Sequence, residues 1–123
     1  MLKIIEGDIF QSGCDLLVCP TNAYPGTMGA LAGQFSSRFP GLEEQYTSFC
    51  RHPFRSRPFL YVFETPEEGR PDVVCFPTCY APGSECDPNL LVDGLKNLGD
   101  VIDDGGYESV AIPALGAGVG GFP

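Results

Sequence analysis

The sequence has little basic charge, a single histidine, no tryptophan and no long apolar run. Its 123 residues include seven Lys and Arg but 16 Asp and Glu, which gives a formal net charge of −9. A domain this acidic repels the phosphate backbone of nucleic acids at long range, so non-specific nucleic-acid binding is disfavoured. A small anion held by backbone amides stays compatible with this charge, because that interaction is local and directional.

The sequence also lacks the segments that direct a protein to a membrane or out of the cell. No apolar stretch approaches the ~20 residues that a helix needs to cross a bilayer. Met1 leads directly into LKIIEGDIF, without the basic and long apolar regions of a secretory signal. Of the six cysteines, Cys14, Cys19 and Cys75 stand in or beside apolar runs, where a free thiol behaves as a small hydrophobe. We therefore expect a reduced, cytoplasmic protein.

The cysteines do not have the spacing of a typical zinc site. No C-x-x-C pair occurs, and the nearest approach to one is CFPTC, from Cys75 to Cys79. The single histidine, His52, lies far from this pair in the sequence. Structural zinc sites usually combine close cysteine pairs with further cysteine or histidine ligands. We expect no metal and no resident cofactor, with structural zinc as the alternative.

Apolar runs and helical periods alternate along the chain. The runs LKIIE (2–6), DLLVCP (15–20), FLYVFE (59–64), DVVCFP (72–77) and SVAIP (109–113) are typical of strands. Helical spacing covers GALAGQFSSRF (29–39) and LEEQYTSFC (42–50), and a longer helix follows after Asp87. This alternation predicts one α/β domain over residues 1–123, with a largely parallel or mixed sheet covered by helices. Ligands of such sheets bind beyond the carboxyl ends of the strands.

The helix after Asp87 is the clearest element in the sequence. Asp87 can cap it, Pro88 fits its first turn, and Gly105 and Gly106 end it. The residues expected to line its buried face are Leu91, Leu95, Leu98 and Ile102.

The glycine-rich end of the chain, LGAGVGGFP, follows the last expected strand. Gly116, Gly118 and Gly121 satisfy the spacing G-x-G-x-x-G, but no helix, second strand or acidic residue follows them as a dinucleotide-binding turn requires. The glycines still permit positive φ and close backbone approach, and successive exposed amides suit a phosphate or pyrophosphate. The alternative is a flexible tail.

A second glycine segment follows DLLVC and leads into a helix. In PTNAYPGTMGALAGQF, the polar pair Thr21 and Asn22 precedes Gly26 and Gly29, and amides at the helix start can bind an anion. Asn22 can hydrogen-bond a sugar hydroxyl, and Asp8 in EGDIF can accept from an exocyclic amine such as that of adenine. Together these features suit one ligand with a pyrophosphate between two sugars.

The segments GDIFQSGCDLLVCPTN, PGTMGALAGQF and SVAIPALGAGVGGFP, in this order, resemble the macrodomain family. The resemblance runs from about Lys3 to the last residue. It implies a three-layer fold, in which helices flank a mixed sheet, and binding of ADP-ribose or related nucleotides. The segments TMGALAGQF and CFPTCYAPGSECDPNLLVDGLKNL look most like the branch that removes ADP-ribose from glutamate or DNA bases.

The resemblance also implies which residues contact the ligand. Asp8 would meet the adenine amine with Ile9 beside it, and Asn22 would lie near the distal ribose. The first glycine segment would wrap the phosphates from one side and the last one from the other, with Phe122 stacking near the adenosine or ribose. The other expected ligand-binding residues are Thr21, Gly26, Thr27, Met28, Gly29, Leu115, Gly116, Ala117, Gly118, Val119, Gly120 and Gly121.

Two departures from that branch bear on catalysis. A lysine follows PT in the penultimate strand of the branch, whereas Cys79 stands there in this chain, and the acid that some members carry in the last glycine loop is replaced by Gly120. Asn22 and Cys79 are therefore the catalytic candidates. A cysteine acts as a nucleophile when a nearby cation or helix N-terminus lowers its pKa, and the sequence places no such partner beside Cys79.

These departures favour a module that binds or sequesters ADP-ribose without turnover. The alternative is a hydrolase that releases ADP-ribose from a modified protein or nucleic acid, or processes ADP-ribose phosphate, with water positioned by the pyrophosphate loops. A third possibility is a scaffold that has lost the activity. Family members continue past the last loop into a helix that covers one sheet face, so we expect marginal stability or a protein partner or second subunit over that face.

Overall fold

The computed structural model describes residues 7–22, 30–50, 60–66, 69–79 and 88–113. The strand expected at 2–6 lies outside these ranges. The described elements are the 3-10 helix η1 (Ile9–Gln11), β1 (Leu16–Asn22), α1 (Ala30–Arg38), α2 (Leu42–Cys50), β2 (Tyr61–Phe63), β3 (Asp72–Cys79), α3 (Pro88–Gly105) and β4 (Val110–Ala111).

The four described strands form one mixed sheet in the order β2-β3-β1-β4. β1 pairs in parallel with both β3 and β4, and β2 pairs antiparallel with β3. The two central strands are buried on both faces, as the continuous apolar run DLLVCP predicts. The outer strands are shorter than expected, because β4 meets β1 at two positions and β2 meets β3 at three.

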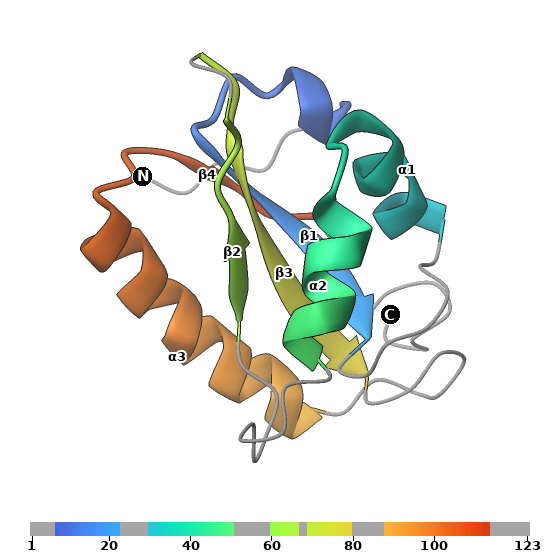
Figure 1. Cartoon of the computed structure of the whole chain (residues 1–123). Helices are drawn as coiled ribbons and strands as arrows, with labels where there is room; N and C mark the ends of the chain where they lie inside the picture. Colours follow the sequence, from blue (N-terminus) through green and yellow to red (C-terminus); the bar gives the residue numbers. More distant parts are fainter. Residues whose placement is uncertain (1–6, 23–29, 51–59, 67–68, 80–87, 114–123) are drawn as a thin grey trace.

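Helices cover both faces of the sheet (Figure 1). α1 and α2 pack on one face through an aromatic-rich cluster that includes Phe35, Phe39 and Tyr46. α3 packs on the other face through a mainly aliphatic cluster built around Leu98 and the ring of Phe76. The three-layer α/β architecture is confirmed.

The buried face of α3 differs from the prediction at one position. Leu95 is 52% exposed, whereas the neighbouring Gly94 is buried. A Cβ atom on Gly94 would lie 2.4 Å from Cζ of Phe76, so the absent side chain lets the aromatic ring reach the helix backbone. The buried face of α3 therefore includes Gly94 instead of Leu95. At position 94 the ring of Phe76 fills the space that a larger side chain would need.

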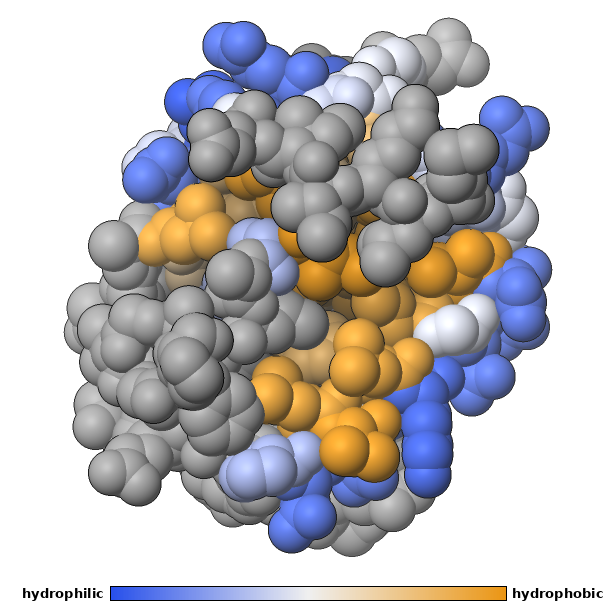
Figure 2. Space-filling view, turned by 180° about the vertical axis from the view of Figure 1, so that it is seen from behind, coloured by the Kyte–Doolittle hydropathy of each residue, from blue (hydrophilic) through white to orange (hydrophobic). Residues whose placement is uncertain are grey.

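Some large apolar side chains remain exposed. Val92 and Leu95 of α3 are each 52% exposed, and Ile112, just after β4, is 45% exposed. Seen from behind, apolar residues gather in the middle of the surface with hydrophilic residues around them (Figure 2). The protein partner or second subunit expected over one sheet face stays a prediction. No helix in the described ranges is long and apolar enough to span a membrane.

Candidate functional site

The carboxyl ends of the parallel strands β1 and β3 lie at one edge of the sheet (Figure 1), whereas β4, which runs parallel to β1, ends at Ala111 opposite Leu17, near the start of β1. From β1 the chain leads to α1 on one face, and from β3 it leads to α3 on the opposite face. Where the connections of neighbouring parallel strands leave toward opposite faces, a crevice forms beyond the strand ends, and ligands of α/β proteins bind there. The sheet has such a switch point between β1 and β3.

The two candidate catalytic residues end the two strands at this switch point. β1 and β3 run in register from Leu16 opposite Asp72, and a register shift after Thr21 brings Asn22 opposite Cys79. Fifty-six residues lie between them in the sequence, but the parallel pairing of β1 with β3 makes them neighbours in the sheet. A bulge at a strand end commonly redirects side chains beside a functional site.

Thr21 precedes the bulge and connects the end of β1 to α2. Its side chain is 7% exposed, and its hydroxyl Oγ1 donates a hydrogen bond of 3.0 Å to the hydroxyl oxygen of Tyr46. Tyr46 is buried in the aromatic-rich cluster and comes one helical turn after Leu42. Sequence reasoning missed Tyr46, although its spacing from Leu42 places both residues on the buried face of α2.

Asp8 and Ile9 belong to a different region of the fold. Asp8 caps η1, because its Oδ1 accepts a hydrogen bond of 2.9 Å from the Phe10 amide. Ile9 is half-buried against the aromatic-rich cluster. The ring of Phe10 holds η1 against α1, with its centroid 4.7 Å from that of Phe35. Figure 1 shows η1 beside the amino-terminal end of β1, whereas Asn22 ends that strand. The contact of Asp8 with adenine stays a prediction.

The remaining expected ligand-binding residues lie outside the described residues. The first group follows the end of β1 and precedes α1, and the second follows β4. β1 and β4 are adjacent and parallel in the sheet, so the two glycine segments follow neighbouring strands that run in the same direction. The residues in these segments are Gly26, Thr27, Met28, Gly29, Leu115, Gly116, Ala117, Gly118, Val119, Gly120, Gly121 and Phe122.

Two thiols lie beneath this edge, within the core. Cys19 of β1 and Cys75 of β3 are register partners, and both side chains are completely buried. A hydrogen bond with the Cys19 thiol, together with burial, raises the pKa of the Cys75 thiol. Cys75 is therefore held as a neutral thiol, the unreactive form. Among the described residues, no three His, Cys, Asp or Glu side chains cluster as ligands for a metal ion.

The opposite end of the sheet holds a polar network instead. The carboxylate of Asp15 accepts hydrogen bonds from the amides of Glu108 and Ser109, at 3.0 and 2.9 Å, and from the Ser109 hydroxyl at 3.2 Å. Asp72 accepts from the Tyr107 hydroxyl at 2.7 Å and from the Thr65 amide at 2.9 Å. These contacts join the starts of β1 and β3 to the segment between α3 and β4, and the contact of Asp72 with Thr65 also joins the start of β3 to the chain after β2.

Residues 18–123 match the model of the Macro domain family. The chain belongs to this family. It is similar over its whole length to the macrodomain of Mycobacterium tuberculosis DarG (27% identity, TM-score 0.91) and to that of Thermus aquaticus DarG (28%, 0.86), covering 82% of each of those chains. It also resembles Thermosipho africanus DarTG in complex with ADP-ribose, at 22% identity and a TM-score of 0.86, over 95% of this chain and 34% of that one.

The curated relatives are longer proteins. The chain is 29% identical over 125 residues to the DNA ADP-ribosyl glycohydrolase of Thermus aquaticus and 29% identical over 124 residues to that of Mycobacterium tuberculosis. It spans 34% and 35% of their lengths, about a third in each case.

Proposed function

We propose that this macrodomain binds ADP-ribose, or a related adenine nucleotide, at the edge where β1 and β3 end. The observation that carries the proposal is the strand order. β1 and β4, which precede the two glycine segments in the sequence, are adjacent and parallel, and β1 and β3 form a switch point. The structure of Thermosipho africanus DarTG, which has a similar fold, is a complex with ADP-ribose, and this supports ADP-ribose as the ligand.

Backbone amides supply the anion-binding chemistry in this proposal. Gly26 and Gly29 directly precede α1, whose amino-terminal amides and dipole favour a negative group. The last glycine segment offers a second run of amides that can meet the same pyrophosphate. This arrangement tolerates the net charge of −9, because directional amide contacts act at short range.

Calorimetric titration with ADP-ribose, and with AMP and NAD as comparison ligands, tests the proposal. We expect micromolar affinity for ADP-ribose and at least about tenfold weaker binding of AMP, because AMP lacks the pyrophosphate and the distal ribose. Replacing Gly118 by valine should abolish binding, since a β-branched side chain restricts the backbone and blocks close approach.

Two aspartate variants separate ligand contact from loss of negative charge. ADP-ribose carries its adenine at the end opposite its distal ribose, so in this proposal Asp8 contacts the adenine far from Asn22, and Asp8→Ala should weaken binding by about tenfold through the loss of one hydrogen bond. Asp93→Ala, on an exposed part of α3, is the control and should bind like the parent chain. Equal affinities of the parent chain and Gly118→Val would remove the glycine segment from the site.

Hydrolysis is the second candidate function. The curated relatives are DNA ADP-ribosyl glycohydrolases, and the backbone pairing of Asn22 with Cys79 places both candidate residues at one point of the edge. In this proposal Asn22 orients the distal ribose, and water held by the pyrophosphate loops attacks its anomeric carbon. The glycosidic bond to the acceptor breaks, and the acceptor leaves with a proton.

Turnover assays on ADP-ribosylated thymidine in single-stranded DNA and on a protein ADP-ribosylated at glutamate test this candidate. We expect release of free ADP-ribose if the chain is a hydrolase and tight binding without release if it is a reader. Cys79→Ser and Cys79→Ala assign the role of the thiol, with Cys14→Ser, at a half-buried free cysteine, as the matched control. Activity that survives both changes at Cys79 excludes a cysteine mechanism and leaves water-dependent hydrolysis.

A further inference from the structure

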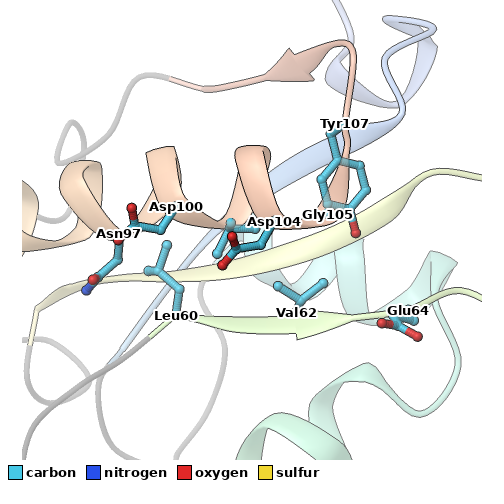
Figure 3. A pocket seen from close by; sticks show the side chains of 9 residues that line it. Leu60, Val62, Glu64, Asn97, Asp100, Asp104, Gly105 and Tyr107 are labelled. Atoms are coloured by element: carbon cyan, nitrogen blue, oxygen red, sulfur yellow. The ribbon is translucent and has the colours of Figure 1, made fainter.

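A groove of about 400 Å³ lies between α3 and the outer strand β2, away from the edge where the central strands end. Leu60, Val62 and Val101 supply its apolar surface. Figure 3 shows Leu60 and Val62 below α3, with the side chains of the helix reaching toward the strand. Leu60, Val62 and Val101 also pack against the aliphatic cluster, so the core of the domain supports the floor of the groove.

The groove runs along β2, at one side of the described sheet. β2 is the outermost of the described strands on this side, and β3 is the strand it pairs with. Leu60, Val62 and Glu64 line the groove, whereas the alternate residues Tyr61 and Phe63 pack on the opposite face of the sheet. An extended segment that paired with the outer edge of β2 would direct every second side chain into the groove beneath α3.

The charges that line the groove are all negative. They come from Glu64, which follows β2, and from Asp100 and Asp104 of α3, one helical turn apart. Figure 3 shows Asp100 and Asp104 on the helix and Glu64 farther along the strand, beyond Val62. No lysine or arginine is among the described residues that line it. An occupant with Lys or Arg side chains would neutralise these carboxylates, whereas an acidic occupant would be repelled.

We propose that this groove is a docking site for an extended segment of a partner protein in which every second residue faces the groove, and these groove-facing residues are in turn apolar and Lys or Arg. The segment adds a strand to β2 by backbone hydrogen bonds. Its apolar side chains contact Val62 and Val101, and its basic groups meet Asp100 and Asp104. The site is independent of the nucleotide edge, so binding of the two ligands is additive.

The probe is a synthetic nine-residue peptide labelled with a fluorophore, in which valine and lysine follow in turn at the odd positions, which face one side of a strand, and serine occupies the even positions. Fluorescence anisotropy against the full chain should show saturable binding that weakens as salt is raised, because part of the affinity comes from exposed charges. The same peptide with N-methyl groups on its central backbone amides keeps its charge but cannot add a strand. We expect its affinity to fall by at least about tenfold. A peptide with glutamate in place of lysine should not bind.

Double charge-reversal variants test whether the peptide binds in the groove. The double variant Asp100→Lys with Asp104→Lys should weaken binding by at least about tenfold. The matched control is Asp93→Lys with Asp103→Lys, which changes the net charge equally on exposed positions of α3 that do not line the groove. Thermal unfolding confirms that each variant is folded, and Val62→Thr, a smaller change, tests the apolar floor if a charge variant fails to fold.

The proposal is overturned by any of three results. One is no saturable binding of the valine–lysine peptide at low salt. Another is equal binding of the N-methylated peptide, which would indicate a purely electrostatic contact. The third is equal weakening by the two charge-reversal pairs, which would show that net charge rather than the groove determines the affinity.

Discussion

At the amino-terminal end of the sheet, Asp15 and Asp72 each accept several hydrogen bonds, whereas the carboxyl end carries a backbone bulge, Asn22 and Cys79. The first end joins β1 and β3 to the chain before β4 by side-chain contacts within the protein. The second end leads into the glycine segment after β1. We infer that the amino-terminal end contributes mainly to the stability of the sheet, and that the carboxyl end contributes mainly to ligand binding.

The largest expected effect is at the amino-terminal end. Asp72→Ala removes the acceptor of both the Tyr107 hydroxyl and the Thr65 amide and leaves both donors partly buried without that partner. We expect the free energy of unfolding to fall by about 2–3 kcal/mol, measured by urea denaturation. ADP-ribose affinity of the folded fraction should stay within about twofold of the parent value. A large loss of affinity without a loss of stability would reverse the roles of the two ends.

The next effect belongs to the carboxyl end. Asn22→Ala should weaken ADP-ribose binding by about tenfold, or ~1.4 kcal/mol, because it removes the proposed hydrogen bond to the distal ribose. The free energy of unfolding should change by less than about 1 kcal/mol. Calorimetry and urea denaturation of the same preparation separate the two quantities. Unchanged affinity would exclude Asn22 from the site.

Tyr107→Phe tests one hydrogen bond of the amino-terminal network. At neutral pH it should lower the free energy of unfolding by about 1 kcal/mol. Burial, and then the hydrogen bond to Asp72, raise the pKa of Tyr107, so the folded state favours the neutral phenol. That contribution is fully present below the unfolded-state pKa of about 10 and is lost as the pH rises above it.

The alkaline loss of stability should therefore be shallower in Tyr107→Phe than in the parent chain, when urea denaturation is compared between pH 8 and 11. Part of the loss should remain, because burial also raises the pKa of Tyr61. Identical profiles for the two proteins would show that Tyr107 does not titrate during unfolding.

The smallest effect is expected at Asp15. Slight burial acts to raise its pKa, but hydrogen bonds from Glu108 and Ser109 outweigh it, and the pKa is lowered. The resulting stability is present above the unfolded-state pKa of about 3.9 and is lost as the pH falls through the folded-state pKa. Because Asp15 is exposed, we expect a contribution of only a few tenths of a kcal/mol. Asp15→Asn should make the stability between pH 5 and 3 slightly less dependent on pH, and a steeper dependence would contradict this assignment.

The pattern of apolar residues within a segment predicted those helices and strands whose formation depends mainly on residues close together in the sequence. The run DLLVCP predicts a strand buried on both faces, and LEEQYTSFC predicts a helix over the range that α2 occupies. The exposed position of Leu95 could not be predicted from period alone, because it results from the contact between Gly94 and Phe76 of another element. The groove beside β2 likewise depends on which strand is outermost, which the sequence does not encode locally.

The candidate site was predictable in its parts but not in their arrangement. The glycine segments and the polar residues around them are visible in the sequence. The pairing of Asn22 with Cys79 requires the parallel register of β1 with β3, and the hydrogen bond from Thr21 to Tyr46 requires the packing of α2 on the sheet.

The hydrogen bond between Thr21 and Tyr46 couples the position of Asn22, the next residue in β1, to helix α2. Because Thr21 is held by a packed helix, we expect the backbone at Asn22 to keep its position when a nucleotide binds. Substitutions in α2, far along the chain from either glycine segment, would then change how fast ADP-ribose leaves. Screens for altered residence time should include that helix.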